Sequence, residues 1–403
     1  MRDFLYEIKL NHLLTVMNKD YLKILPREII KVVTLFAARL FTMLNKSDSP
    51  LWLISERGTD ARDNAFFFFV WLKENHPEIN AKYVISDKSK DYPKLLKYKD
   101  SIVIYDSFDH YKKIWQASYL ISTHICGYRP DLQYFSELDR RFNILKSKKK
   151  VFLQHGIIKN DLKALYAKNV NLDLFICGAK PEYDYVKSKF GFKSGIVEYT
   201  GLCRYDNLLD FSVKKQILIM PTWRMYIDKH HFKESLYFDA YRKLLTSKAF
   251  QDIAIRSEYK IIFYPHYEIQ QFIDDFKNLP LSSNIIIADM SYDVQTLLKE
   301  SAVLITDYSS VFFDFAFMHK PILFYQFDKK EFFSKHYHIG YISEGNFGKV
   351  VETIDGCCDE LKYVFSHNCE IDEIYRNYID AFFEKRDNNN CLRVFNAIKA
   401  IKK

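Results

Sequence analysis

The sequence predicts an α/β protein with two doubly wound units, each built on a parallel sheet, that face each other across a cleft. Short runs of β-branched and aromatic residues recur from residue 51 onward, at intervals of about 20 to 30 residues. Segments with helical periodicity separate many of these runs, which is typical of parallel sheets covered by helices. The pattern restarts after residues 206–212, and 403 residues are enough for more than one domain.

The first series of strands precedes the predicted junction near residue 210. Helical segments between them are expected at 64–74, 108–117 and 181–190. The predicted strands are 51–55, 81–86, 101–106, 119–123, 150–155, 173–178 and 197–201.

The second series follows the junction and ends in a helical tail. A helix is expected at 234–250, and the tail from Gly348 onward is expected to form two or three helices. The domain boundaries are therefore predicted at 1–49, 50–210, 211–385 and 386–403, the last being a C-terminal helix. The predicted strands are 216–223, 260–266, 284–289, 303–307 and 321–327.

The N-terminal region 1–49 is predicted to be helical and amphipathic. The run 29–44 is about 16 residues long, shorter than the roughly 20 that a membrane-spanning helix needs. Lys31 and Arg39 interrupt it, and Pro26 stands near its expected start. Early charges at Asp3 and Glu7 argue against a signal peptide. Two interpretations stay open: a helix that lies on an anionic membrane surface, and a helix packed on the catalytic domain.

Composition limits the partners and the compartment. The 59 Lys and Arg residues exceed the 51 Asp and Glu residues, a net charge of +8 that favours anionic ligands such as nucleotides, phosphopolymers or acidic headgroups. No RNA-binding signature or arginine-rich stripe is present, so no nucleic acid partner is expected. The seven cysteines are scattered without a C-x-x-C pair, which favours reduced thiols in the cytoplasm and no zinc site.

Three common catalytic motifs are missing from the sequence. It holds no G-x-x-x-x-G-K-S/T loop, no G-x-G-x-x-G after the first strand and no G-x-S-x-G elbow. These absences argue against a P-loop NTPase, a dinucleotide oxidoreductase and an α/β-hydrolase.

His155 and His266 each end a predicted strand and are the candidate catalytic residues. In QHG, His155 is a candidate general base, and Gly156 lets the backbone approach a ligand closely. In YPH, His266 can donate a hydrogen bond to a phosphate oxygen. The alternative is that such a histidine only bonds a loop.

The segment TDYSSVFFD predicts a phosphate-binding turn. Asp307, Ser309 and Ser310 follow a strand and precede a helix, so hydroxyl groups and unpaired amides meet at one place. A serine there can also serve as an N-cap, and the two roles are compatible.

Other polar residues are weaker candidates. Arg224 in PTWR could clamp a phosphate, whereas Arg204 and Asp206 in TGLCRYD lie at the junction and could be structural. Asp63 and Asn64 follow the first strand; they could cap the next helix or face an acceptor.

These motifs, in this order, resemble the CDP-glycerol glycerophosphotransferase family, which builds teichoic acids and related capsular polymers. The resemblance covers roughly residues 50–385 and rests on QHG, YPH and TDYSSVFFD, with support from DARDN, TGLCRYD and PTWR. It implies a GT-B-like fold of two Rossmann-type domains, an acceptor domain at 50–210 and a CDP-donor domain at 211–385. It also implies peripheral attachment to the inner face of the cell membrane.

The resemblance further implies a reaction and its ligands. His155 would be the catalytic base, and His266, Ser309 and Ser310 would hold the pyrophosphate of CDP-glycerol, with Gly156, Arg224 and Asp307 on the donor side. The acceptor would be a hydroxyl of a phosphopolymer or its lipid-linked precursor, and CMP would leave. No tightly bound cofactor or metal is expected, while a divalent cation accompanying the donor stays open.

Several alternatives remain at this point. The donor could be CDP-ribitol, or the chain could be a GT-B glycosyltransferase that uses a nucleotide sugar. A basic, non-enzymatic scaffold at the membrane is a third interpretation. Single addition or polymerisation, acceptor identity and oligomeric state are not predicted.

Overall fold

The computed structural model describes residues 19–44, 49–335 and 340–401. The chain divides into two compact units, one ending at Leu153 and the other beginning at Gln154. The predicted boundary near residue 210, between an acceptor domain and a donor domain, remains a prediction. Of the segment 1–49, which was predicted to be helical, residues 1–18 and 45–48 lie outside the described residues.

The first unit contains a parallel sheet in the strand order β3-β2-β1-β4-β5. The chain first forms β1 and then β2 and β3 to one side, and it returns to place β4 and β5 on the other side of β1. Its elements are α2 (Lys19–Leu44), β1 (Leu51–Ser55), α3 (Asn64–Asn75), β2 (Ala81–Ile85), η1 (Tyr92–Ser101), β3 (Ile102–Ile104), α4 (Phe108–Gln116), β4 (Ala117–Ser122), α5 (Phe135–Phe142) and β5 (Lys149–Phe152).

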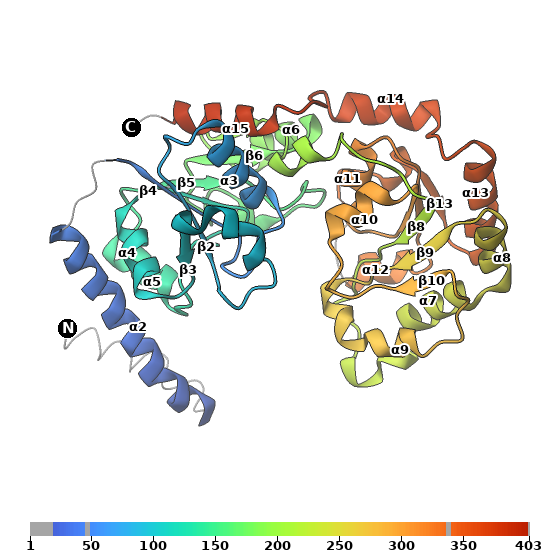
Figure 1. Ribbon diagram of the computed structural model, residues 1–403, viewed down its shortest axis with the longest axis horizontal. Coiled ribbons are helices and arrows are strands. Elements are labelled where there is room, and N and C mark those ends of the chain that lie inside the picture. Colours follow the sequence, from blue (N-terminus) through green and yellow to red (C-terminus); the bar gives the residue numbers. More distant parts are fainter. Residues whose placement is uncertain (1–18, 45–48, 336–339, 402–403) are drawn as a thin grey trace. The chain divides into compact units, whose positions relative to one another are not determined.

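Helices cover both faces of this sheet, which explains its continuous apolar strands. Alternate residues of β1 point to opposite faces. Leu51 and Leu53 share a buried cluster with α2, α4 and α5, while the Trp52 ring stacks on Phe68 of α3 at 6.4 Å between centroids. Figure 1 shows α2 lying along α4.

The second unit contains a parallel pair, β6 with β7, and a six-stranded parallel sheet in the order β10-β9-β8-β11-β12-β13. Its elements are η2 (Lys163–Leu165), β6 (Leu174–Cys177), α6 (Lys180–Lys189), β7 (Val197–Tyr199), η3 (Cys203–Asn207), β8 (Gln216–Ile219), η4 (Lys229–Glu234), α7 (Leu236–Thr246), α8 (Lys248–Arg256), β9 (Lys260–Phe263), η5 (Tyr267–Phe272), α9 (Ile273–Lys277), β10 (Ile285–Ile287), α10 (Val294–Glu300), β11 (Val303–Thr306), α11 (Phe312–Phe317), β12 (Ile322–Tyr325), α12 (Lys329–Lys335), η6 (Glu344–Asn346), β13 (Lys349–Val351), α13 (Ile354–Ser366), α14 (Glu373–Phe382) and α15 (Asn390–Ala400).

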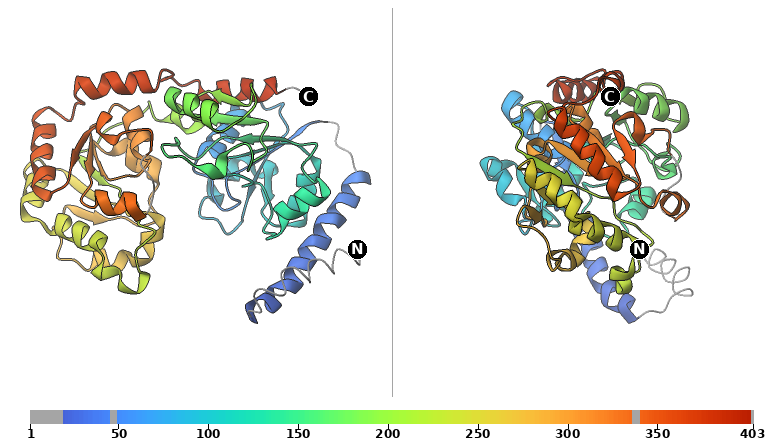
Figure 2. Two further views of the ribbon diagram at one scale, coloured as in Figure 1. Left: turned by 180° about the vertical axis from the view of Figure 1, so that it is seen from behind. Right: turned by 90° about the vertical axis from the view of Figure 1, so that its right-hand side faces the viewer.

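Strand alternation divides the core of the six-stranded sheet into two layers. Leu218, Ile262 and Leu304 pack with α10, α11 and α14, whereas their neighbours Ile219 and Ile305 pack with α7, α8 and α13. Figure 2 shows α13 beside α8, and both helices pack on the same face of this sheet. Packing on both faces holds the strands in place, and it therefore also positions the loops that follow them.

The structure confirms the predicted α/β class, and a strand overlaps each predicted strand range. Several strands are shorter than predicted: β5 ends at Phe152 and β9 at Phe263, so His155 and His266 lie in the loops that follow them. Three further details differ from the prediction. The expected helix 234–250 is two helices, because Ser247 is extended and its hydroxyl accepts the N–H of Phe250 to cap α8. The short strand β13 was not predicted within the helical tail. Helix α2 begins at Lys19 and contains Pro26 in its interior. Among the described helices, none is long and apolar enough to cross a membrane.

Candidate active site

The loops after β8, β9 and β11 carry most of the predicted site residues. These parallel strands are neighbours, so their carboxyl ends lie along one edge of the sheet, where α/β proteins bind ligands. PTWR follows β8, YPH follows β9, and Asp307 to Ser310 follow β11. All three loops belong to the second unit.

Arg224 and Asp307 are buried and bonded to each other. Arg224 is 1% exposed, and its Nη1 donates to Asp307 Oδ2 at 2.9 Å. Its Nε and Nη2 donate to the Asp328 carboxylate at 2.7 and 3.0 Å. Asp307 Oδ1 accepts the N–H of Thr222 at 2.8 Å. These two predicted donor ligands therefore do not reach solvent; they join three loops and hold the turn after β11 in place.

Ser309 and Ser310 lie at the open side of the same turn. Ser310 is exposed and Ser309 is half-buried, with its Oγ accepting the N–H of Val311 at 3.4 Å. The following helix α11 has only six residues, so its dipole is small. The hydroxyls, rather than a long helix, are the feature of this turn that suits a phosphate.

His266 is held in one orientation by its neighbours. Its Nδ1 accepts the N–H of Glu268 at 3.2 Å, and its ring stacks on Trp223 with centroids 6.0 Å apart. Partial burial lowers the pKa of His266, against the opposing charges of Glu268 and Asp307. A neutral ring whose Nδ1 is an acceptor carries its proton on Nε2, so His266 can donate that N–H to a ligand oxygen.

His155 stands on a turn that contacts the Ser310 turn. The side chain is exposed, and the preceding Gln154 has a φ of 59°, a left-handed conformation that turns the chain sharply after β5. A Cβ placed on Gly156 would lie 3.8 Å from Ser310 Oγ. The QHG turn and the TDYSS turn, distant in sequence, are therefore adjacent in the second unit.

Glu182 fixes the QHG turn from the interior. This fully buried carboxylate accepts the N–H groups of Ile158 and Gly178, each at 2.6 Å, and the side-chain amide of Gln154 at 3.1 Å. Burial raises the pKa of Glu182 to about 7, although these hydrogen bonds favour its ionised form. Sequence reasoning missed this residue because only the fold brings α6 under the turn.

Asp63 and Asn64 serve the first turn of α3. Asp63 is the N-cap, and its Oδ1 accepts the N–H of Asn64 at 2.7 Å, while Asn64 is fully buried. The buried carboxylate of Glu56 accepts the N–H groups of Arg62 and Asp63 at 3.1 and 2.7 Å. Asp63 therefore caps α3, while Asn64 is the buried first residue of that helix.

His124 is a further polar candidate that sequence reasoning passed over. It follows β4, which is the neighbour of β1 at the point where the strand order of the first unit reverses. Its Nδ1 lies 3.0 Å from Thr123 Oγ1, and its N–H donates to Ser122 Oγ at 3.1 Å. Ligands of open α/β sheets bind at such points. The run YLISTH, a strand ending in histidine like QHG and YPH, was the available signal.

Over the residues that the structure describes, no group of three or more His, Cys, Asp or Glu side chains is placed to hold a metal ion.

Comparisons with known proteins agree with the motifs. The family model described as CDP-Glycerol:Poly(glycerophosphate) glycerophosphotransferase matches residues 36–400. The minor teichoic acid biosynthesis protein GgaB of Bacillus subtilis (strain 168) is 35% identical over 375 residues, 89% of this chain and 40% of that protein. The teichoic acid glycerol-phosphate primase of the same organism is 29% identical over 183 residues, 43% of this chain and 44% of that protein. The chain thus spans less than half the length of these relatives.

Solved structures support the fold. The wall teichoic acid polymerase TagF, in its H548A form, superposes with a TM-score of 0.64 at 16% identity, covering 96% of this chain and 100% of that chain. A putative UDP-N-acetylglucosamine 2-epimerase from Listeria monocytogenes superposes with a TM-score of 0.54 at 12% identity, covering 87% and 96%. The GT-B-like α/β architecture and the resemblance expected from the motifs are confirmed. The chain belongs to the CDP-glycerol:poly(glycerophosphate) glycerophosphotransferase family.

Proposed function

We propose that this chain transfers a polyol phosphate, glycerol phosphate in the first instance, from a CDP-linked donor to a hydroxyl of a cell-surface polymer or its lipid-linked precursor. One observation carries the proposal: the QHG turn meets the TDYSS turn, with the Cβ position of Gly156 at 3.8 Å from Ser310 Oγ. The turn that carries the exposed side chain of His155 therefore lies against the turn that carries the half-buried Ser309 and the exposed Ser310, just after the carboxyl end of β11.

The residues supply the parts that a phosphoryl transfer needs. His155 takes the proton of the acceptor hydroxyl as its oxygen attacks the polyol-side phosphorus of the donor. The new phosphorus–oxygen bond forms as the bond to the bridging oxygen breaks, and CMP leaves with the bonding electrons. Nε2–H of His266 and the hydroxyls of Ser309 and Ser310 bind the diphosphate oxygens and stabilise their charge.

Buried residues position these groups in the proposed reaction. Arg224, Asp307 and Asp328 hold the loops after β8 and β11, so the two serines keep their places when an anion binds. A divalent ion accompanying the donor would add charge stabilisation on the diphosphate.

Donor screening tests the proposal directly. Purified protein is incubated with an oligomeric glycerol phosphate acceptor and with labelled CDP-glycerol, CDP-ribitol or UDP-sugars, and the released nucleotide is identified. Acceptor-dependent release of CMP from CDP-glycerol is expected; CMP from CDP-ribitol alone would change the polyol. Release of UDP, or of no nucleotide from any donor, contradicts the proposal. The His155→Ala variant tests the assignment of the base.

We further propose that α2 attaches the protein to the inner face of the cell membrane. Leu35 and Ala38 are buried against α4, while the opposite side of the helix is apolar and exposed. An amphipathic helix with such a face binds the acyl boundary of a bilayer. The exposed apolar residues are Ile29, Ile30, Val33, Leu40, Phe41, Met43 and Leu44.

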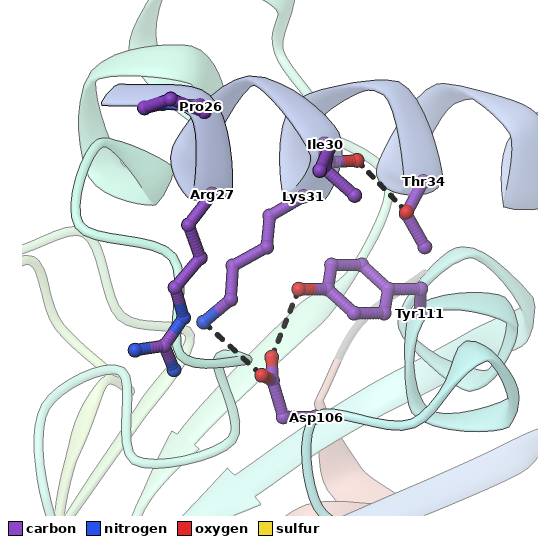
Figure 3. Close-up of a pocket in the computed structure, with 7 residues that line it drawn as sticks. All are labelled: Pro26, Arg27, Ile30, Lys31, Thr34, Asp106 and Tyr111. Atoms are coloured by element: carbon purple, nitrogen blue, oxygen red, sulfur yellow. Dashed lines mark hydrogen bonds and ion pairs between the residues drawn. The ribbon is translucent and has the colours of Figure 1, made fainter. Parts of the chain in front are cut away.

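The basic residues of α2 have more specific roles than expected. Figure 3 shows Lys31 directed at Asp106, with which it forms an ion pair of 3.1 Å. Both residues line a pocket of about 490 Å³. Lys31 is also 2.7 Å from Asp131, so it joins the helix to the unit instead of meeting headgroups. Arg27, 68% exposed, and Arg39 remain at the surface beside the apolar face.

Vesicle flotation tests the attachment. Vesicles that contain about one-third anionic lipid are expected to bind the full chain, and Leu40→Asp with Leu44→Asp should abolish binding without loss of donor turnover in solution. Ile374→Asp, at a 73% exposed apolar residue of α14, is the matched control and should bind normally. Equal binding of all three proteins would contradict the proposal.

A further inference from the structure

Arg204 links the QHG turn to helix α11, which follows the TDYSS turn. It lies in η3, after β7, and its Nε and Nη2 donate to the two oxygens of Asp314 at 2.6 and 2.8 Å. Its Nη1 donates to the main-chain carbonyl of His155 at 2.8 Å. One guanidinium therefore bonds the QHG turn and a residue of α11.

Both partners of the ion pair are largely shielded from water. The side chains of Arg204 and Asp314 are 12% and 7% exposed. A charged group in such a place is costly to bury unless each of its hydrogen-bonding atoms is satisfied. The planar guanidinium group of Arg204 meets this condition because it donates to the carboxylate of Asp314 and also to the carbonyl of His155.

The neighbouring contacts show what this link controls. Glu182 fixes the QHG turn to α6 through Ile158 and Gln154, and Lys159 donates to the carbonyl of Tyr308 at 2.6 Å. Neither contact engages the backbone of His155 itself. Arg204 is bonded to that backbone, and it is also 3.9 Å from the Cβ position of Gly156, which in turn faces Ser310.

We propose that Arg204 is a positioning residue of the transfer reaction, which holds the backbone of His155 at a fixed distance from the Ser310 turn through its ion pair with Asp314. The inference rests on the proposed function, because it assumes that His155 and Ser310 act on one substrate. Arg204 touches no reacting atom; it sets the separation of the groups that do.

The Arg204→Lys variant tests the inference because lysine keeps the charge and loses the fork. The three hydrogen bonds leave from three different nitrogens of the guanidinium, and the one nitrogen of an ammonium cannot reproduce that geometry, so the turn should shift. A displacement of about 1 Å at a reacting group can cost about 100-fold in rate. We expect kcat to fall by about 30- to 100-fold while the KM for CDP-glycerol changes less than about threefold.

Arg393→Lys is the matched control. Arg393 also belongs to the second unit, pairs with Asp387 at 2.9 Å and donates to the carbonyl of Thr200 at 2.7 Å, but it bonds neither turn. Unfolding temperatures of the two variants show whether any rate loss is only a loss of folded protein. A similar fall of kcat in both variants would overturn the inference.

A readout without turnover separates this inference from the proposed function. The imidazole NMR signals of His155, assigned with His155→Gln, should shift in Arg204→Lys and stay unchanged in Arg393→Lys. Unchanged signals in Arg204→Lys overturn the positioning role, even if the protein releases CMP. If the wild-type protein releases no CMP from any CDP-polyol while the signals shift, the proposed function fails and the structural link stands.

Discussion

The two histidines of the candidate site differ in their surroundings, and this difference predicts different kinetic effects. His155 is exposed on its turn, whereas His266 is half-buried, stacked on Trp223 and bonded to the N–H of Glu268. A base contributes mainly to the transition state, so His155→Ala should lower kcat by about 100- to 10,000-fold with little change in donor affinity. His266→Ala should weaken both. Steady-state kinetics and calorimetric titration with CDP-glycerol measure the two effects; near-normal turnover of His155→Ala would refute its role.

Arg224 is predicted to matter for stability more than for donor contact. Its removal leaves the carboxylates of Asp307 and Asp328 buried without their cation. Breaking a buried pair in this way costs about 3 to 5 kcal/mol. Arg224→Ala should therefore lower the free energy of unfolding by that amount in urea titrations. Arg57→Ala, at a 63% exposed ion pair, should change it by less than about 1 kcal/mol. A stable Arg224→Ala protein that fails only in donor binding would restore the phosphate-clamp interpretation.

The buried carboxyl group of Glu56 is expected to make the folded state less stable as the pH rises. Burial, and then the charge of Asp63, raise the pKa of Glu56 from 4.5 to about 8. The folded state holds a proton that the unfolded state releases, so this stabilisation is complete below about pH 4.5 and is lost as the pH rises toward 8. Glu182, with a pKa of about 7, acts in the same direction.

The Glu56→Gln variant isolates this effect. Its unfolding temperature should fall less steeply between pH 5 and pH 8 than that of the wild type, as measured by calorimetry. Exposed Glu137→Gln should keep the wild-type slope. Identical slopes in all three proteins would mean that Glu56 is ionised throughout this range.

The candidate site residues were chosen by residue type and by their position after a strand, and neither feature predicts whether a side chain is exposed. His155, His266, Ser309 and Ser310 could be named because each follows an apolar strand in the sequence. Arg224 follows a strand in the same way, yet the fold buries it with two carboxylates from β11 and β12. Such pairing depends on loops more than 80 positions away in the chain, which no local pattern records.

At the scale of the element, hydrophobic runs predicted the strands because both faces of each sheet are covered. Fully buried strands such as β8 and β11 each contain three consecutive apolar residues instead of an alternation of apolar and polar residues. Strand β13 was missed because it has three residues, begins at the exposed Lys349 and lies at the edge of its sheet. The break between α7 and α8 was missed because helical periodicity continues through Ser247, whose capping role appears only in its backbone conformation. Local sequence patterns predict which residues face the core. The edge strands of a sheet and the capping residues of helices depend on contacts between distant parts of the chain, which a local pattern does not contain.

At the scale of the whole molecule, the residues proposed to bind the donor all belong to the unit that begins at Gln154. A ligand that binds the folded state at 100 times its Kd adds about 2.7 kcal/mol of stability, and the amides nearest to it gain the most protection from hydrogen exchange. With saturating CDP-glycerol, the intact chain should therefore show its largest gain of protection at 154–158, 264–268 and 306–311. CMP should protect the same segments more weakly, because it lacks the second phosphate that Ser309 and Ser310 are proposed to hold. Strongest protection at the 56–63 loop of the first unit would instead place the donor on the other unit, and the roles assigned to His266 and the two serines would have to be abandoned.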